Sequence, residues 1–342
     1  MIKEIFIKDK KIKLSSYLIL ISLPILISIL ALVIGRMPLS LGQIIDFFGA
    51  YISGKDFDPM LESVIINVRL PRIITGLVVG AGLATAGLAF QGVFSNPLAT
   101  PDILGVSSAA SLGAIIGILL SLSTLSIQVF ALVFGLVGVV FTLYIGKTRT
   151  RSSTIMLILA GLVVSSLSNA LASLLKYTAD PTDKLPAISY WLMGSFARSS
   201  YKNLILSAPL IIFGIILIRL LIFRLNIMSL SEDEAKSLGV DVRKTRLIFI
   251  FASTLITASS ISMCGQVGWI GLIIPHMARM MVGANNTHTL PFSISLGASL
   301  MVLIEALSRT VSVIELPISV LTAIIGAPIF ISLIRKTGGG FN

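Results

Sequence analysis

Charged residues are scarce in this chain. Asp, Glu, Lys and Arg together make up 12% of its 342 residues, whereas 55% are apolar. A soluble domain carries about 25% charged residues, so the composition excludes a protein that hides its apolar surface from water by folding alone. The net charge of +11 would favour nucleic-acid binding in a soluble protein, but the basic residues lie in short segments between apolar runs, where they direct membrane orientation. We therefore predict an all-α polytopic membrane protein with no nucleic-acid partner.

Cysteine and histidine are almost absent. Cys264 is the single cysteine, which excludes an intramolecular disulfide and a metal site built from several cysteines. His276 and His288 are the two histidines, and two imidazoles without a carboxylate or thiol partner make a poor metal site. The sequence therefore predicts no metal site.

The centres of the apolar runs lack clusters of ionisable residues. Ion-coupled carriers place such groups near the membrane midplane. Their absence argues against an ion-coupled secondary transporter, which is one class of protein that this composition could otherwise describe. Gly146-Lys147-Thr148 resembles the end of a phosphate-binding loop, but Phe141 stands where that loop requires glycine. We expect no nucleotide site on this chain, and no constellation typical of an enzyme.

Apolar runs long enough to cross the hydrocarbon core, about 20 residues each, recur along the whole chain. They predict one transmembrane domain, residues 1–342, with about ten helices and a basic cytoplasmic tail, residues 1–14. Lys and Arg are more frequent in the segments on the side of the N-terminus, which predicts that both termini are cytoplasmic, N-in and C-in. The predicted spans are residues 15–35, 70–91, 105–122, 126–146, 154–175, 202–223, 246–265, 268–283, 290–307 and 317–335.

The predicted cytoplasmic loop of residues 229–246 carries the signature of a short helix. Ser231 is a suitable N-cap, acidic residues follow it in the first turn, and Gly239 is suited to end the helix. The pattern predicts an amphipathic helix at residues 231–238, with Ala235 and Leu238 on its apolar side. On local grounds an ordinary surface loop is equally compatible with the sequence.

Eight motifs, in order along nearly the whole chain, resemble the iron–siderophore and vitamin B12 permease family, the membrane subunits of type II ABC importers. The motifs are residues 69–72 (RLPR), 80–82 (GAG), 91–99 (QGVFSNPLA), 102–106 (DILGV), 235–240 (AKSLGV), 268–279 (GWIGLIIPHMAR), 315–319 (ELPIS) and 326–330 (GAPIF).

This resemblance implies the type II importer permease fold and a multi-pass protein of the inner, or cytoplasmic, membrane. It implies a second permease subunit, identical or different, two ATPase subunits that carry ATP and Mg, and an extracytoplasmic binding protein. The chain itself, embedded in membrane lipid, would be no enzyme and hold no cofactor. The expected cargo is an iron chelate, an iron–siderophore, with vitamin B12, haem or an oxyanion as alternatives within the family.

The resemblance also implies a docking site for the binding protein. Arg69 and Arg72 lie three residues apart, on one face of a helix start, and Arg309 matches a third basic docking position. We expect Arg69 and Arg72 to be exposed at the outer surface, and the cluster of three, with Arg309 at the outer end of its span, to bind carboxylates of the partner. Anchoring to lipid headgroups is the alternative, and Glu305, four residues before Arg309, offers an internal partner.

Three further sites follow from the resemblance. The expected ATPase-coupling residues are Glu232, Glu234, Ala235, Leu238 and Gly239. The expected cytoplasmic gate consists of Ser152, Ser153 and Thr154, small polar residues suited to a constriction, although a plain loop is equally allowed. Tyr190 and Trp191 are expected beside the outer mouth, where aromatic residues also serve as membrane-interface anchors.

Overall fold

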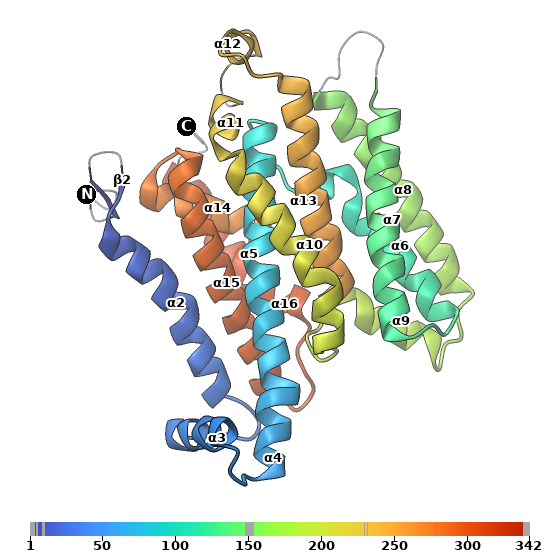
Figure 1. The fold of residues 1–342 in the computed structure, drawn as a ribbon. Coiled ribbons are helices and arrows are strands. Elements are labelled where there is room, and N and C mark those ends of the chain that lie inside the picture. Colours follow the sequence, from blue (N-terminus) through green and yellow to red (C-terminus); the bar gives the residue numbers. More distant parts are fainter. Residues whose placement is uncertain are drawn as a thin grey trace.

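The computed structural model describes residues 4, 6–8, 11–147, 154–228, 230 and 232–337. Over these residues the fold is helical apart from one two-stranded antiparallel hairpin, β1 (Ile7–Lys8) and β2 (Lys11–Ile12). The helices form one elongated bundle (Figure 1). An all-α fold is therefore confirmed.

Ten apolar helices of the described residues correspond to the ten predicted spans. Seven are long and apolar enough to cross a membrane, and three apolar helices are shorter. The long ones are α2 (Leu14–Val33), the continuous segment Pro59–Val93 that ends in α5 (Leu70–Val93), α7 (Thr124–Ile145), α8 (Thr154–Tyr177), α10 (Tyr201–Leu220), α13 (Val242–Cys264) and α15 (Asn286–Thr310). The short ones are α6 (Val106–Leu119), α14 (Ile270–Val282) and α16 (Ile318–Thr337).

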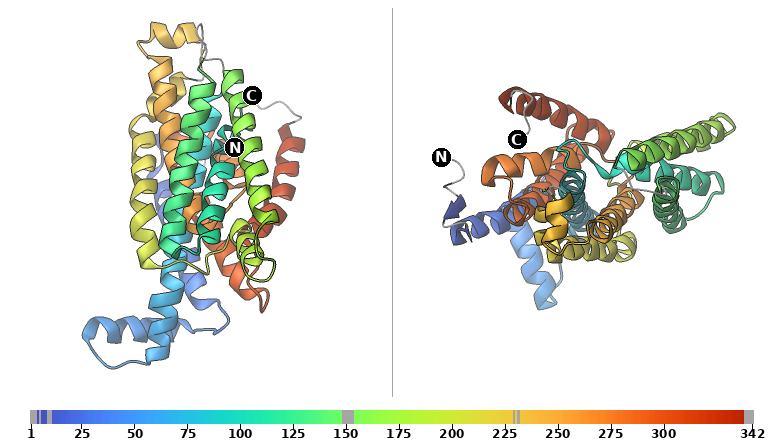
Figure 2. Two further views of the ribbon diagram at one scale, coloured as in Figure 1. Left: turned by 90° about the vertical axis from the view of Figure 1, so that its right-hand side faces the viewer. Right: turned by 90° about the horizontal axis from the view of Figure 1, so that it is seen from above.

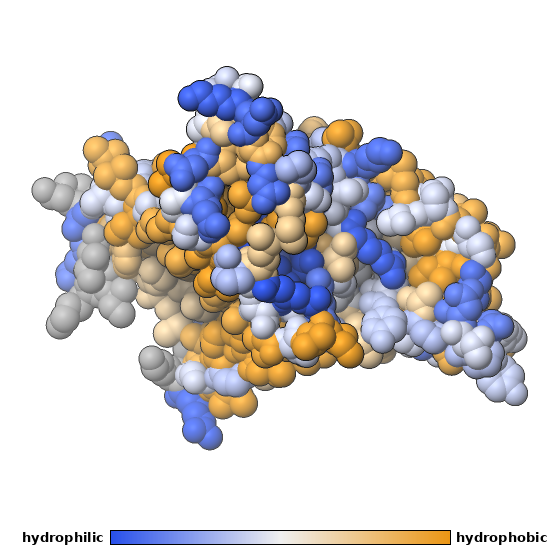
Figure 3. Space-filling model, turned by 90° about the horizontal axis from the view of Figure 1, so that it is seen from below, coloured by the Kyte–Doolittle hydropathy of each residue, from blue (hydrophilic) through white to orange (hydrophobic). Residues whose placement is uncertain are grey.

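The bundle has two distinct ends. Helix α2 begins and α16 ends at the same end, which also carries α11 (Ile222–Ile227) and α12 (Glu232–Ser237) and is called the terminal face below (Figure 1). The opposite face carries α3 (Leu41–Ser53) and α9 (Lys184–Leu192). Seen from that side, it shows patches of hydrophilic side chains among apolar ones (Figure 3). The charge bias of the sequence predicts that the terminal face is cytoplasmic.

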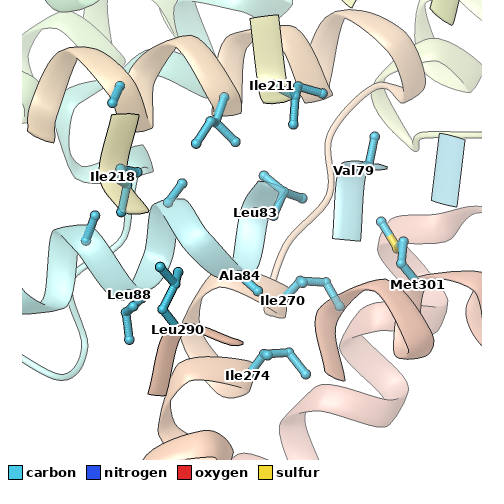
Figure 4. Close-up of a cluster of buried hydrophobic side chains, with 14 of the residues drawn as sticks. Val79, Leu83, Ala84, Leu88, Ile211, Ile218, Ile270, Ile274, Leu290 and Met301 are labelled. Atoms are coloured by element: carbon cyan, nitrogen blue, oxygen red, sulfur yellow. The ribbon is translucent and has the colours of Figure 1, made fainter. Parts of the chain in front are cut away.

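Helix α5 lies at the centre of the bundle and packs against α10, α13, α14 and α15. Small residues permit this packing. A Cβ added to Gly80 would collide with the backbone of Gly297 in α15, and one added to Gly87 would collide with Gly271 in α14. The close approach of helix backbones is the principal source of helix association in lipid. Around these contacts lie the apolar side chains of Figure 4, among them Val79, Leu83, Leu88, Ile211, Ile218, Ile270, Ile274, Leu290 and Met301.

The segment between the first two spans is helical, which the sequence analysis did not predict. Helix α3 begins at a capping box in which the Ser40 hydroxyl accepts a hydrogen bond from the Gln43 backbone and the Gln43 side chain accepts one from the Ser40 backbone. After a turn, α4 (Pro59–Glu62) and the π-helical η1 (Ser63–Arg69) lead directly into α5. This 35-residue segment is about 50 Å long, so it extends beyond a hydrocarbon core of about 30 Å.

Candidate functional site

Three arginines and two glutamates meet inside the opposite end of the bundle, and are called the charge cluster below. They come from η1 (Arg69), α5 (Arg72), α15 (Glu305 and Arg309) and the segment between α15 and α16 (Glu315). Arg72 Nε lies 2.8 Å from Glu305 Oε1, and its terminal nitrogens lie 2.7 and 3.0 Å from the two Glu315 oxygens. Arg309 Nε lies 3.1 Å from Glu305 Oε1. Such bidentate and shared contacts are the strong form of ion pairing.

Other donors of the charge cluster bind carbonyls at the end of α2 and directly after it. Arg69 donates hydrogen bonds to the carbonyls of Leu32 and Met37, and Arg309 donates one to the carbonyl of Ala31. Gly35 makes room for this approach, because a Cβ there would lie 2.9 Å from the Arg69 guanidinium carbon. The charge cluster therefore ties together α2, α5, α15 and the segment that precedes α16.

The prediction that these three arginines are exposed is wrong. Arg69, Arg72 and Arg309 are 2%, 5% and 5% exposed, so they are not the free surface charges that we expected. Their donors are directed to glutamates and to helix-end carbonyls inside the bundle, which compensates for burial. The internal alternative that the spacing suggested, the pair Glu305–Arg309, is confirmed. The signal that the sequence analysis did not use was Glu315, in the motif that precedes α16.

The short helix at the terminal face is confirmed as α12, Glu232–Ser237; the predicted first residue, Ser231, lies outside the described residues. Ala235 is buried at 1% exposure, whereas Leu238 is 60% exposed, so only one of the two residues expected on the apolar side packs inward. Gly239 has φ of 77°, the left-handed conformation that ends a helix. The positions proposed for coupling, Glu234 included, thus lie on and directly after a helix that projects from the bundle (Figure 1).

The expected gate falls largely outside the described residues. Ser152 and Ser153 are not among them, and Thr154 is the first residue of α8, half-buried at the terminal face.

The two aromatic residues expected at the outer mouth lie in α9 and have different environments. Trp191 is 7% exposed and packs in an apolar cluster with α6 residues, whereas Tyr190 is 64% exposed. Both border a pocket of about 260 Å³ between α9, the end of α13 and the segment before α16. Arg198 and Glu315 also line this pocket, so one carboxylate belongs both to the charge cluster and to the pocket wall.

Helix α8 exposes a polar stripe that the sequence analysis missed. Ser166, Asn169 and Ser173 are all exposed and, at spacings of three and four residues, lie on one side of the helix. Among the described residues, no hydrogen bond is formed by the Asn169 side chain. The neighbouring stripe is apolar, with Leu167 53% exposed. The signal in the sequence was this spacing of polar residues within an apolar run.

The side of the bundle to which α8 belongs also contains α16 (Figure 2). Lipid does not satisfy the amide group of Asn169, which indicates that the polar stripe of α8 faces water or another protein, while its apolar stripe can face lipid. A polytopic bundle with such a face, a pocket at one end and a projecting helix at the other has the features of a transport protein.

Residues 22–336 match the FecCD transport family, and the chain belongs to this family. It is 42% identical, over 93% of this chain and 95% of the relative, to the molybdate import system permease protein MolB of Haemophilus influenzae. It is 36% identical, over 82% of this chain and 84% of the relative, to an iron chelatin transport system permease protein of Helicobacter pylori. A solved structure, an inward-facing conformation of a metal-chelate type ABC transporter, matches with a TM-score of 0.84, 40% identity and coverage of 93% and 97%.

These findings confirm that the chain is a multi-pass permease of the ABC importer class with the corresponding fold. They also confirm that it is a transport subunit and not an enzyme, since its relatives are permease proteins. The substrates in the names of the relatives differ, molybdate in one and an iron chelate in the other. Family membership therefore establishes that the chain is an ABC importer permease, whereas the substrate differs between members of the family.

Proposed function

We propose that this chain is one half of a permease dimer that carries an iron chelate, an iron–siderophore, into the cytoplasm. In this proposal an extracytoplasmic binding protein delivers the chelate, and two separate ATPase subunits, which hold ATP and Mg, drive transport. The chain itself binds no cofactor. The cytoplasmic membrane is the expected location.

The observation that carries the proposal is the polar stripe of α8. A helix that faced only lipid would expose the amide of Asn169, beside Ser166 and Ser173, at a cost, because unsatisfied polar groups are unfavourable in hydrocarbon. A second permease copy opposite this side of the bundle would enclose the stripe and give the cargo a hydrated path. Small hydroxyl and amide groups suit passage of a bulky solute, because they offer hydrogen bonds without a strong charge.

The coupling part of the proposal rests on α12. The helix projects from the terminal face, its Ala235 packs on the bundle, and Leu238 presents 60% of its surface outward. An exposed leucine beside a short helix is suited to an apolar cleft on an ATPase. Because α12 packs on α13, movement of a docked partner would be transmitted to a helix of the bundle core.

Thiol labelling tests the hydrated path. Cys264 is the single cysteine and is 2% exposed, so a Cys264→Ala background carrying Asn169→Cys reports on one site. In membranes with the whole transporter, we expect Asn169→Cys to react with a water-soluble maleimide at least tenfold faster than Leu167→Cys, the matched control on the apolar stripe. Equal, slow labelling of both positions would contradict a path along α8.

Uptake measurements test the cargo. We expect a strain that lacks this chain to lose ATP-dependent uptake of radioactive iron–siderophore and to regain it when the gene is restored. Oxyanion transport is the second candidate, favoured by the 42% identity to the molybdate permease. Loss of molybdate uptake with unchanged iron–siderophore uptake would replace the first cargo by the second, and loss of neither would reject both.

A further inference from the structure

A long apolar groove runs along one side of the bundle. It lies between α2 and α10, with residues of α5 and α15 also lining it, and has a volume of about 940 Å³. The groove exists because α2 packs mainly against α15 and makes few contacts with α5. Helices α2 and α10 are therefore apart along much of their length, as the ribbon also shows (Figure 1).

The groove is apolar along its length and charged at one end. Of the residues that line it, Arg219 alone carries a charge, and it is exposed. The hydroxyls of Ser28 and Ser295 in the wall are engaged by carbonyls of α2, those of Pro24 and Leu20, at 2.7 Å each. Between the described residues no ion pair involving Arg219 is formed.

The charged end is the terminal face. Arg219 lies in the last turn of α10 and Tyr17 in the first turns of α2, and both helices have these ends at that face. Leu32, near the other end of α2, lines the far end of the groove. From Tyr17 to Leu32 the helix rises about 22 Å, which is most of the hydrocarbon thickness of about 30 Å.

We propose that this groove is a binding site for one anionic phospholipid, whose acyl chains lie along α2 and α10 and whose phosphate pairs with Arg219. Charge complementarity identifies the occupant. Arg219 places a positive charge at one end of the apolar groove, which matches a lipid with a negative headgroup. Basic side chains between membrane helices are known to select such lipids. A zwitterionic lipid would fill the groove equally well but would carry no net negative charge to pair with the Arg219 guanidinium. This proposal rests on the membrane fold and not on the cargo.

Native mass spectrometry of the full-length protein tests the site. The protein is released from nanodiscs that contain equal amounts of phosphatidylglycerol and phosphatidylcholine. We expect the wild type to retain one phosphatidylglycerol in preference to phosphatidylcholine. Arg219→Gln should lower that preference about fivefold, since one basic residue near an anionic lipid contributes about 1 kcal/mol. Arg224→Gln is the matched control, because Arg224 is exposed in the adjoining α11 and does not line the groove.

A second variant tests the apolar part of the site. Ala81 of α5 lines the groove and is half-buried, so Ala81→Leu should reduce the retention of both lipids without changing the preference between them. The proposal is overturned if Arg219→Gln and Arg224→Gln change the preference equally, or if the wild type shows none. Retention that is unaffected by Ala81→Leu would likewise place the bound lipid elsewhere.

Discussion

Neutralising Glu305 should destabilise the protein more than any other conservative change in the charge cluster. Its side chain has no exposed surface and lies between Arg72 at 2.8 Å and Arg309 at 3.1 Å. Glu305→Gln keeps the shape of the side chain but leaves the buried guanidinium groups of Arg72 and Arg309 without the anion that they share. Removal of one partner from a buried ion pair costs about 3–5 kcal/mol. At 2–4 °C per kcal/mol for a large domain, the midpoint of thermal unfolding should fall by on the order of 10 °C.

The assay is the loss of monodisperse protein on heating in detergent, with the wild type and an exposed-carboxylate control in parallel. Asp46 lies exposed on α3, so Asp46→Asn should change the midpoint little, as surface substitutions do. Glu315→Gln should have an intermediate effect, because the Glu315 side chain is 25% exposed and water screens part of its charge.

A double variant separates ion pairing from packing. Glu305→Leu combined with Arg309→Met removes the acid and one base together, and leaves Arg72 with its bidentate partner Glu315. Replacement of a buried pair by apolar side chains is often neutral, so this double variant should be more stable than Glu305→Gln. The reasoning about buried charge is refuted if Glu305→Gln unfolds at the same temperature as the wild type. It is also refuted if the double variant unfolds at a lower temperature than Glu305→Gln.

Two further predictions concern helix contacts and coupling. Gly87→Ala should destabilise the bundle by about 1–3 kcal/mol, because the added Cβ meets the backbone of Gly271. Gly49→Ala is the control, since a Cβ at that position of α3 meets nothing within 4 Å. This second change should be neutral or stabilising by up to about 1 kcal/mol. Thermal unfolding in detergent measures both, and equal effects would contradict the packing argument. Leu238→Asp should abolish co-purification of the ATPase subunits, whereas Val313→Asp, which alters an 88% exposed side chain near the opposite face, should not. Retained association in Leu238→Asp would remove α12 from the coupling role.

Hydropathy predicted the membrane helices well, because a helix in lipid must be apolar along about 20 residues. It failed between residues 37 and 69, where α3 has 13 residues, too few to cross the membrane, and η1 ends in arginine. A search for runs of about 20 apolar residues passes over such short segments, and the capping box at Ser40 was the local signal of a helix start.

The sequence predicted the candidate site only where the conformation depends on neighbouring residues in the chain. Gly239 ends α12 because its own conformation is left-handed, and that follows from the residue type. Burial of Arg72 follows from Glu305, which is 233 residues away in the sequence. No local pattern of charge distinguishes a surface arginine from one that a distant carboxylate compensates.

That separation also affects how the protein enters the membrane. During synthesis α5 is complete long before Glu305 and Glu315 exist, so Arg69 and Arg72 reach the bilayer without counter-ions. Arginine side chains in that situation extend toward the headgroups. The inward position seen in the folded chain is available only after α15 has been inserted. A nascent chain that stops before Glu305 should therefore hold α5 in a shallower position, with its arginines in contact with water.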